Sequence, residues 1–274
     1  DTDRSRGLGD VYKRQAYERL QAARAQDRPT SRAYIENLFT ERTELHGDRK
    51  YADDPAIIGG IGYLGDIPVT FIGIERGRDL QERIRCNFGC PMPEGYRKAL
   101  RLMKQAEKFH RPVICFVDTS GAYCGEEAEE RGQGQAIADN LMQMMGLETP
   151  IITIVIGEGG SGGALGLSVA NRVYMLENAV FSVISPEGCA SILWEDASKA
   201  ADAAECLKIT AEDMKRFGVA EDVIEENFDS FDVMCEDLKA RLLSDVQELE
   251  QYSGRVLSEK RYERFRKLGV YSEK

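Results

Sequence analysis

The spacing of apolar residues predicts strands and helices that alternate along the chain. Residues 112–118 (PVICFVD) and 150–156 (PIITIVI) are continuously apolar runs, which is typical of strands buried on both faces of a parallel sheet. Between them, residues 128–145 have helical spacing, and Gly146 is placed to end that helix. A strand, a helix and a second strand in this order predict an α/β fold with parallel pairing.

The flanking segments extend the same pattern. Residues 16–45 have helical spacing, and Thr30 and Ser31 form a signal for the start of a helix. Two strands follow, joined by a hairpin turn at Gly65 and Asp66. The further predicted elements are strands at 56–63, 67–74, 173–176, 180–184 and 223–224, helices at 93–109, 162–170, 186–194 and 198–207, a long helix from Phe231 that Gly254 ends, and a short helix that carries Tyr262 and Phe265.

The composition is that of a globular protein with an acidic balance. Of 274 residues, 42% are hydrophobic and 30% charged, and 36 Lys and Arg stand against 47 Asp and Glu, a net charge of −11. Nucleic acid is not expected as a partner, because phosphate contacts need a basic surface. No apolar run approaches the ~20 residues of a membrane span, so we expect neither a membrane segment nor a secretory signal.

The cysteines indicate reduced thiols and no bound metal. There are seven, an odd number, and several lie in apolar runs, which favours a cytoplasmic location. Cys86 and Cys90 are four residues apart, but no second Cys or His pair completes a zinc site.

Each buried strand ends in a turn of small residues. The first turn runs from Asp118 to Ala122, and the second from Gly157 to Gly163, within a stretch, 157–166, that has six glycines in ten residues. Glycine lets the backbone approach a ligand closely, and unpaired amides and the helix dipole favour negative charge at the start of the following helix. Such a turn can hold a phosphate or stabilise an oxyanion.

Several other interpretations of the second turn are weaker. A Walker motif is excluded because no Gly-Lys-Ser/Thr follows, and a dinucleotide fingerprint fits poorly. A purely structural turn stays open, although so many glycines cost chain entropy. Ser161 fits the G-x-S-x-G pattern of a hydrolase, but the two histidines, His46 and His110, both precede it. Other orders of a catalytic triad exist, so a hydrolase also stays open.

Two charged clusters have both a chemical and a structural interpretation. The first cluster consists of four glutamates that could supply the acid and base of a hydratase. Alternatively, their negative charge could simply interact favourably with the dipole at a helix N-terminus: Glu126, Glu127, Glu129 and Glu130. Between Arg76 and Arg111, ten Lys or Arg stand against four Asp or Glu. One helical face of that segment could attract the phosphates of coenzyme A, or could be an ordinary solvated face: Arg97, Arg101, Lys104 and Lys108.

A series of motifs resembles the α subunit of the bacterial acetyl-CoA carboxylase carboxyltransferase family. In order they are Gly47 to Ile61, Cys86 to Met103, Val117 to Tyr123, Glu129 to Gln133, Val155 to Ala164 and Ser182 to Trp194. The resemblance extends from about Ala16 to the C-terminus and implies an α/β, crotonase-like (ClpP/crotonase) superhelical ββα fold with helical N- and C-terminal extensions. We accordingly expect a non-native or disordered segment (1–15), a helical arm (16–50), a crotonase-like carboxyltransferase domain (51–254) and a C-terminal helical tail (255–274).

The resemblance also implies a reaction and its partners. The carboxyl group of carboxybiotin, attached to a biotin carboxyl carrier protein, would move to acetyl-CoA and give malonyl-CoA for fatty acid synthesis. A β subunit with a zinc ribbon would complete an α2β2 assembly. The implied alternatives are a subunit of a biotin-dependent acyl-CoA decarboxylase and a non-catalytic scaffold for a β-type subunit.

The resemblance assigns the site to backbone groups. The amides of Gly162 and Gly163 would form the oxyanion hole for the ureido carbonyl of carboxybiotin. The implied substrate-binding residues are Gly159, Gly160, Ser161, Ala164, Gly121 and Ala122. Ser120 and Cys124 replace two prolines that the first turn commonly has in the family, and Asn227 to Asp229 stand where a Gly-Gly-Ala-His segment is common.

Overall fold

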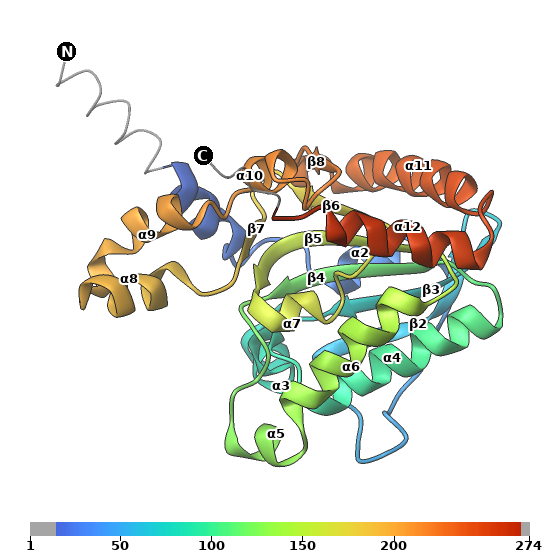
Figure 1. The fold of residues 1–274 in the computed structure, drawn as a ribbon, viewed down its shortest axis with the longest axis horizontal. Helices are drawn as coiled ribbons and strands as arrows, with labels where there is room; N and C mark the ends of the chain where they lie inside the picture. Colours follow the sequence, from blue (N-terminus) through green and yellow to red (C-terminus); the bar gives the residue numbers. More distant parts are fainter. Residues whose placement is uncertain (1–14, 270–274) are drawn as a thin grey trace.

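A mixed β-sheet flanked by helices forms the centre of the computed structural model, which describes residues 15–269 (Figure 1). The segment expected to be non-native or disordered, 1–15, lies outside the described residues except for its last residue, as do residues 270–274. The strands, in their order across the sheet, are β1 (Thr40–Glu44), β2 (Ile57–Leu64), β3 (Ile67–Ile74), β4 (Val113–Thr119), β5 (Ile151–Gly160), β6 (Arg172–Leu176) and β8 (Asp222–Ile224), with β7 (Val180–Ser182) beside β5.

The sheet changes from antiparallel to parallel at β3. Strands β1, β2 and β3 pair antiparallel, whereas β3, β4, β5, β6 and β8 pair parallel. Strand β5 is central: its first half pairs with β6, and its last three residues, Glu158, Gly159 and Gly160, pair with β7. The glycine-rich end of β5 therefore lies where the sheet divides between two partner strands.

Helices cover both faces of this sheet. On one face lie α4 (Pro93–Lys108) and α6 (Gln133–Gly146), and on the other α2 (Ser31–Leu38), with α11 (Phe231–Leu249) packed against it (Figure 1). A Cβ at Gly59 would lie 2.4 Å from Leu102 of α4, and one at Gly73 would lie 2.7 Å from Ser31 of α2. Since Gly73 pairs with Ile58, the neighbour of Gly59, these two glycines point to opposite faces and let both helices approach closely.

A helical hairpin stands off the sheet beside β7. It consists of α8 (Pro186–Trp194), η2 (Ala197–Lys199) and α9 (Ala200–Leu207), which pack on one another (Figure 1). The other helical segments are residues 15–23, α3 (Leu80–Arg85), η1 (Asn87–Gly89), α5 (Glu126–Glu130), α7 (Ser161–Leu165), α10 (Ala211–Arg216), η3 (Phe228–Ser230) and α12 (Gly254–Arg266). None of the described helices is long and apolar enough to cross a membrane.

Three sequence predictions were wrong in detail. The helix expected over 16–45 is interrupted and ends in β1, whose five side chains are all exposed. An edge strand of this kind has no apolar alternation, because only its backbone joins the sheet. The helix expected over 128–145 breaks at Gly132, which has φ +80°. Gly254 begins α12 and does not end the long helix, which stops at Leu249.

A wholly buried arginine fastens α12 to the end of α6. The Arg261 guanidinium donates to the carbonyl oxygens of Leu147 (2.8 Å) and Thr149 (2.8 Å) and to Asn171 Oδ1 (2.7 Å). Burial lowers the pKa of Arg261 to about 10, so the group stays charged at neutral pH. It supplies donors to carbonyls that the end of a helix leaves without partners.

We predict that Arg261→Met lowers the free energy of unfolding by about 3 kcal/mol or more, because several buried carbonyls lose their donors at ~1–3 kcal/mol each. Chemical denaturation of the chain measures this. The matched control is Arg255→Met, since the Arg255 side chain is 82% exposed on the same helix. Equal stability of the two variants would contradict this interpretation of Arg261.

Candidate active site

The two glycine turns predicted from the sequence touch each other, backbone against backbone. A Cβ at Gly160 would lie 2.1 Å from the carbonyl oxygen of Ser120. A Cβ at Gly163 would lie 2.5 Å from the amide nitrogen of Ala122 and 2.7 Å from the carbonyl carbon of Gly121. Such an approach has no room for a side chain, so both positions require glycine. The structure thus brings Gly121 and Ala122 next to Gly163.

The second turn leads from β5 directly into the short helix α7. Ser161 makes the change of direction with φ +50°, a conformation that non-glycine residues rarely adopt. The amides of Gly162 and Gly163 lie in the first turn of α7, where N–H groups have no acceptor within the helix. Because α7 has five residues, its dipole is weaker than that of a long helix, and the amides themselves are the principal donors.

Two buried side chains hold α7 in place through hydrogen bonds to its backbone carbonyls. Tyr96 Oη donates to the carbonyl oxygen of Gly163 at 3.1 Å, and Asn140 Nδ2 donates to that of Gly166 at 3.0 Å. Burial raises the pKa of Tyr96 well above its usual value, so its hydroxyl remains a donor. Neither residue could be found from a sequence motif, because each lies on a helix remote in the chain from α7.

A pocket opens beside the end of β5. It is lined by Leu20, Ser120, Glu158, Gly159, Gly160, Ser161, Val180, Ser182, Ile184, Ser185, Pro186 and Ile209. Three of the predicted substrate-binding residues, Gly159, Gly160 and Ser161, are therefore in its wall. Ala164 is fully buried in the hydrophobic core, and its side chain does not line this pocket.

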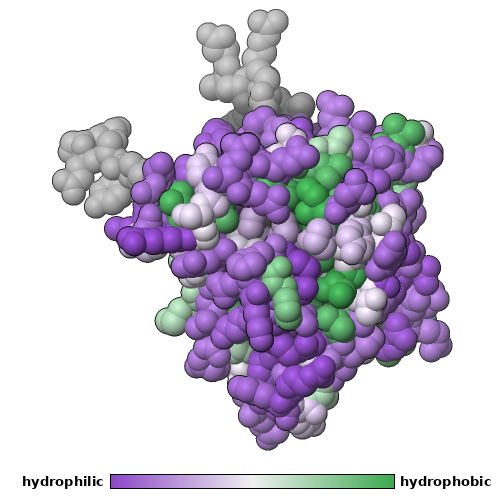
Figure 2. All heavy atoms as spheres, turned by 90° about the vertical axis from the view of Figure 1, so that its right-hand side faces the viewer, coloured by the Kyte–Doolittle hydropathy of each residue, from purple (hydrophilic) through white to green (hydrophobic). Residues whose placement is uncertain are grey.

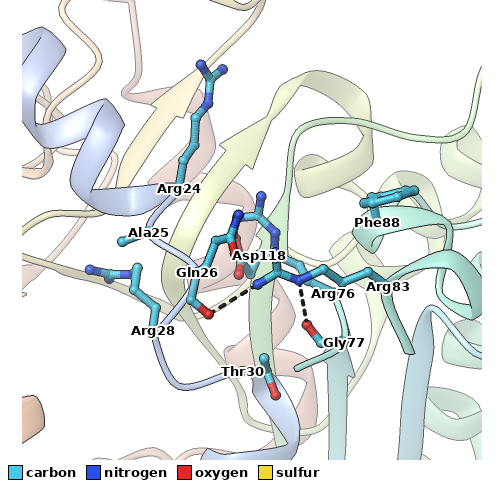
Figure 3. Close-up of a pocket in the computed structure, with 10 residues that line it drawn as sticks. All are labelled: Arg24, Ala25, Gln26, Arg28, Thr30, Arg76, Gly77, Arg83, Phe88 and Asp118. Atoms are coloured by element: carbon cyan, nitrogen blue, oxygen red, sulfur yellow. Dashed lines mark hydrogen bonds and ion pairs between the residues drawn. The ribbon is translucent and has the colours of Figure 1, made fainter. Parts of the chain in front are cut away.

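Buried charges surround the same strand ends. Glu158 is 6% exposed and is bound by Arg24 Nε at 2.9 Å and by Arg76 Nη2 at 3.4 Å. Arg76 Nη1 also donates to Asp118 at 3.1 Å, inside a second pocket that Arg24 and Arg28 help to line (Figure 3). Burial acts to lower the pKa of Arg76, but Asp118 and Glu158 raise it above its usual value. These carboxylates are therefore paired with guanidinium groups.

The other candidate groups have structural roles. The four glutamates lie at exposed or solvent-facing positions of α5, three of them in its first turn, which favours the helix-terminus interpretation. In the basic cluster, Arg97 Nε donates to Asp48 at 2.7 Å and Arg101 Nε to the carbonyl oxygen of Gly47 at 3.0 Å. Both thus secure the 46–54 loop.

Neither the histidines nor the cysteines supply a nucleophilic system at the pocket. His46 is exposed and bound to Asp53 at 3.0 Å, and neither histidine lines the pocket beside Ser161. All seven cysteines are free thiols. Cys90 Sγ lies 3.5 Å from Ser120 Oγ, and burial raises the pKa of this thiol. Within residues 15–269, no three His, Cys, Asp or Glu side chains gather in a group that could hold a metal.

Comparison with known proteins agrees with this geometry. A family model described as acetyl co-enzyme A carboxylase carboxyltransferase-like matches residues 5–269. The chain belongs to this family. It is 57% identical over 258 residues to the acetyl-coenzyme A carboxylase carboxyl transferase subunit alpha of Ruminiclostridium cellulolyticum, covering 94% of this chain and 99% of the relative.

Two further comparisons concern a longer relative and the fold. The chain is 54% identical over 263 residues to the carboxyl transferase subunits beta/alpha of Clostridium tetani, covering 94% of this chain but 46% of that one. The fold is similar to that of transcarboxylase 12S, with a TM-score of 0.68 and 18% identity, over 85% of this chain and 44% of that chain. The predicted α/β crotonase-like fold is confirmed.

We predict that Gly163→Ala lowers the free energy of unfolding by about 1–3 kcal/mol, because the new methyl group must push two backbones apart. Chemical denaturation measures it. Gly134→Ala is the matched control: it lies in α6 with nothing within 4 Å of the new Cβ. Gly134→Ala should raise the free energy of unfolding by up to about 1 kcal/mol, because alanine has a higher helix propensity than glycine. A stable Gly163→Ala chain would show that the two turns are not in tight contact.

Proposed function

We propose that this chain is the α subunit of an acetyl-CoA carboxylase carboxyltransferase. It transfers the carboxyl group from carboxybiotin, on a biotin carboxyl carrier protein, to acetyl-CoA and gives malonyl-CoA. The observation that carries the proposal is the contact of the two glycine turns, which brings Gly163 against Gly121 and Ala122, directly after the pocket-lining residues Gly159, Gly160 and Ser161. The 57% identity to a carboxyl transferase subunit alpha supports the same assignment.

The proposed site for the bicyclic ring of biotin is the pocket beside the end of β5. Gly159, Gly160 and Ser161 form part of its wall at the end of β5, where Phe181 packs over Gly159 and the backbone of Ser120 over Gly160. The lining also includes apolar side chains, among them Leu20, Val180 and Ile184. Apolar walls with a few fixed polar groups are typical of small-molecule sites.

The chain contributes fixed donors to the reaction. The amides of Gly162 and Gly163 would stabilise negative charge on the ureido oxygen, and a donor of this kind is worth about 2.7–4 kcal/mol of barrier. When bound, carboxybiotin supplies the carboxyl group and a basic ureido nitrogen. Tyr96 keeps the peptide after Gly163 in place through its hydrogen bond at 3.1 Å. With Glu158 paired to two arginines, no free side-chain base is assigned, which agrees with the reliance on backbone groups.

A β-type subunit is the proposed partner, in an α2β2 assembly. The relative named subunits beta/alpha carries both parts in one chain, which supports the pairing. Exposed apolar side chains lie at the C-terminal end of α8 and just before this helix, and together we call them the α8 patch: Ile192, Leu193 and Trp194 at the end of α8, and Val183 between β7 and α8. By contrast, the face at the right-hand side of Figure 1 is mostly hydrophilic (Figure 2). Apolar clusters of this kind mark interaction sites. We also propose a cytoplasmic location, which the seven free thiols support.

The activity test combines this chain with a matching β-type subunit and follows malonyl-CoA decarboxylation with free biotin as the acceptor. We expect activity only when both subunits are present. We expect Gly163→Ala to lower it about 10²-fold, because the new methyl group displaces the Gly163 amide from the position at which it would bind the oxyanion. Gly134→Ala should retain the activity of the unchanged chain. An assembled but inactive mixture would contradict the proposal, and turnover of glutaconyl-CoA in place of malonyl-CoA would indicate the decarboxylase alternative.

The α8 patch has its own test. We predict that Ile192→Asp weakens assembly with the β-type subunit by about tenfold or more, because a charge must be buried in the interface. Titration calorimetry or sedimentation measures the dissociation constant. Met142→Asp is the matched control, since Met142 is equally exposed (74% against 72%) but lies on α6. Equal weakening by both variants would argue against the α8 patch as the contact.

A further inference from the structure

The pairing of β4 with β5 contains an irregularity at the edge of the active site. Val117 pairs with Val155, and Thr119 pairs with Gly159. One residue of β4, Asp118, therefore lies opposite the three β5 residues 156–158. Extra residues of this kind form a bulge, which bends the strand and redirects the chain that follows. Here the chain that follows is the second glycine turn.

The Asp118 carboxylate fills this bulge. Its Oδ1 accepts a hydrogen bond from the amide of Glu158 at 2.9 Å. A Cβ at Gly157 would lie 2.3 Å from the same oxygen, so the carboxylate lies directly over the backbone of Gly157. Asp118 is 5% exposed, and a buried carboxylate in this position needs partners.

Two arginines complete the arrangement from other parts of the chain. Arg76 Nη1 donates to Asp118 Oδ1 at 3.1 Å, and Arg76 Nη2 lies 3.4 Å from Glu158 Oε1. Arg24 bridges Glu158 (2.9 Å) and Glu187 in the first turn of α8 (2.7 Å). The bulge is thus fixed from β4, from the end of β3 and from the N-terminal segment.

We propose that Asp118 is a positioning residue for the oxyanion donors. By holding the bulge at 156–158, it sets the point at which β5 ends and so the direction in which the amides of Gly162 and Gly163 point. It acts through the backbone of Glu158, and Arg76 keeps its carboxylate in place. This inference rests on the proposed function for its kinetic readout, but its structural readout is independent of it.

The kinetic test uses the assembled enzyme with malonyl-CoA and free biotin. We expect Asp118→Ala to lower kcat about 10²-fold while KM for malonyl-CoA changes less than about threefold, because a displacement of ~1 Å at a catalytic group costs this much. Asp118→Asn keeps an oxygen acceptor for the Glu158 amide and should lose less than about tenfold, a partial rescue. A merely structural role would lower the amount of folded enzyme and leave kcat per assembled site unchanged.

The matched control is Asp48→Ala. Asp48 is also a buried carboxylate that accepts from backbone amides and an arginine, here Tyr51 N (2.7 Å) and Arg97 Nε (2.7 Å), but it serves the 46–54 loop. Its loss should lower stability and leave kcat unchanged. If Asp118→Ala and Asp48→Ala have the same effect on kcat, the inference is wrong.

Hydrogen exchange separates this inference from the function. We expect faster exchange of the amides of residues 157–163 in Asp118→Ala, or in Asp118→Asn should the alanine chain not fold, and no change there in Asp48→Ala. Unchanged exchange in both Asp118 variants overturns the inference. An inactive wild-type assembly would overturn the proposed function, while the exchange result would still decide whether Asp118 fixes the turn.

Discussion

The site depends on one contact, in which two stretches of backbone touch without side chains between them. Gly160 lies against the carbonyl of Ser120, and Gly163 against the amide of Ala122. Packing of side chains normally fixes how two segments lie together, because interiors interdigitate at high density. Bare backbone offers no such interlocking, so the position of the turns has to be fixed by their surroundings. The hydrogen bond from Tyr96, the bulge in β5 and the paired charges all serve this purpose.

The charges add a constraint that apolar burial does not supply. Burial is non-directional, and it would allow the N-terminal segment to rest on the sheet in several ways. Arg24 is bound to Glu158 and to Glu187, residues that lie 134 and 163 positions further along the chain. Taking such groups out of water costs free energy unless each finds its partner, so a shifted arrangement is disfavoured. The ion pairs of Arg24 therefore specify how the N-terminal segment, the end of β5 and α8 lie relative to one another, whatever the pairs contribute to stability.

The sequence predicted the part of the fold that local pattern determines. Strands β4 and β5 are continuous apolar runs, and the Gly65 hairpin has a two-residue signal, so these elements were predicted within one to four residues. The glycine-rich turns were also evident, because their composition is unusual. Strand β1 was missed because its side chains face solvent and its pattern is that of a polar loop. The bulge in β5 could not be predicted, since a register between strands is a property of the pair and not of either segment.

The same limit applies to the residues around the site. Tyr96 donates to Gly163, which is 67 positions away in the sequence, and Arg76 donates to Asp118, which is 42 positions away. No sequence pattern predicts either hydrogen bond. Asp118 was identified only as the residue at which the first glycine turn begins. The site residues were hard to predict because the proposed chemistry is performed by backbone amides. Every residue except proline carries an amide, so the identity of the donors carries little information. What distinguishes this turn is where the amides point, and that information is distributed over the side chains that hold the two glycine turns together.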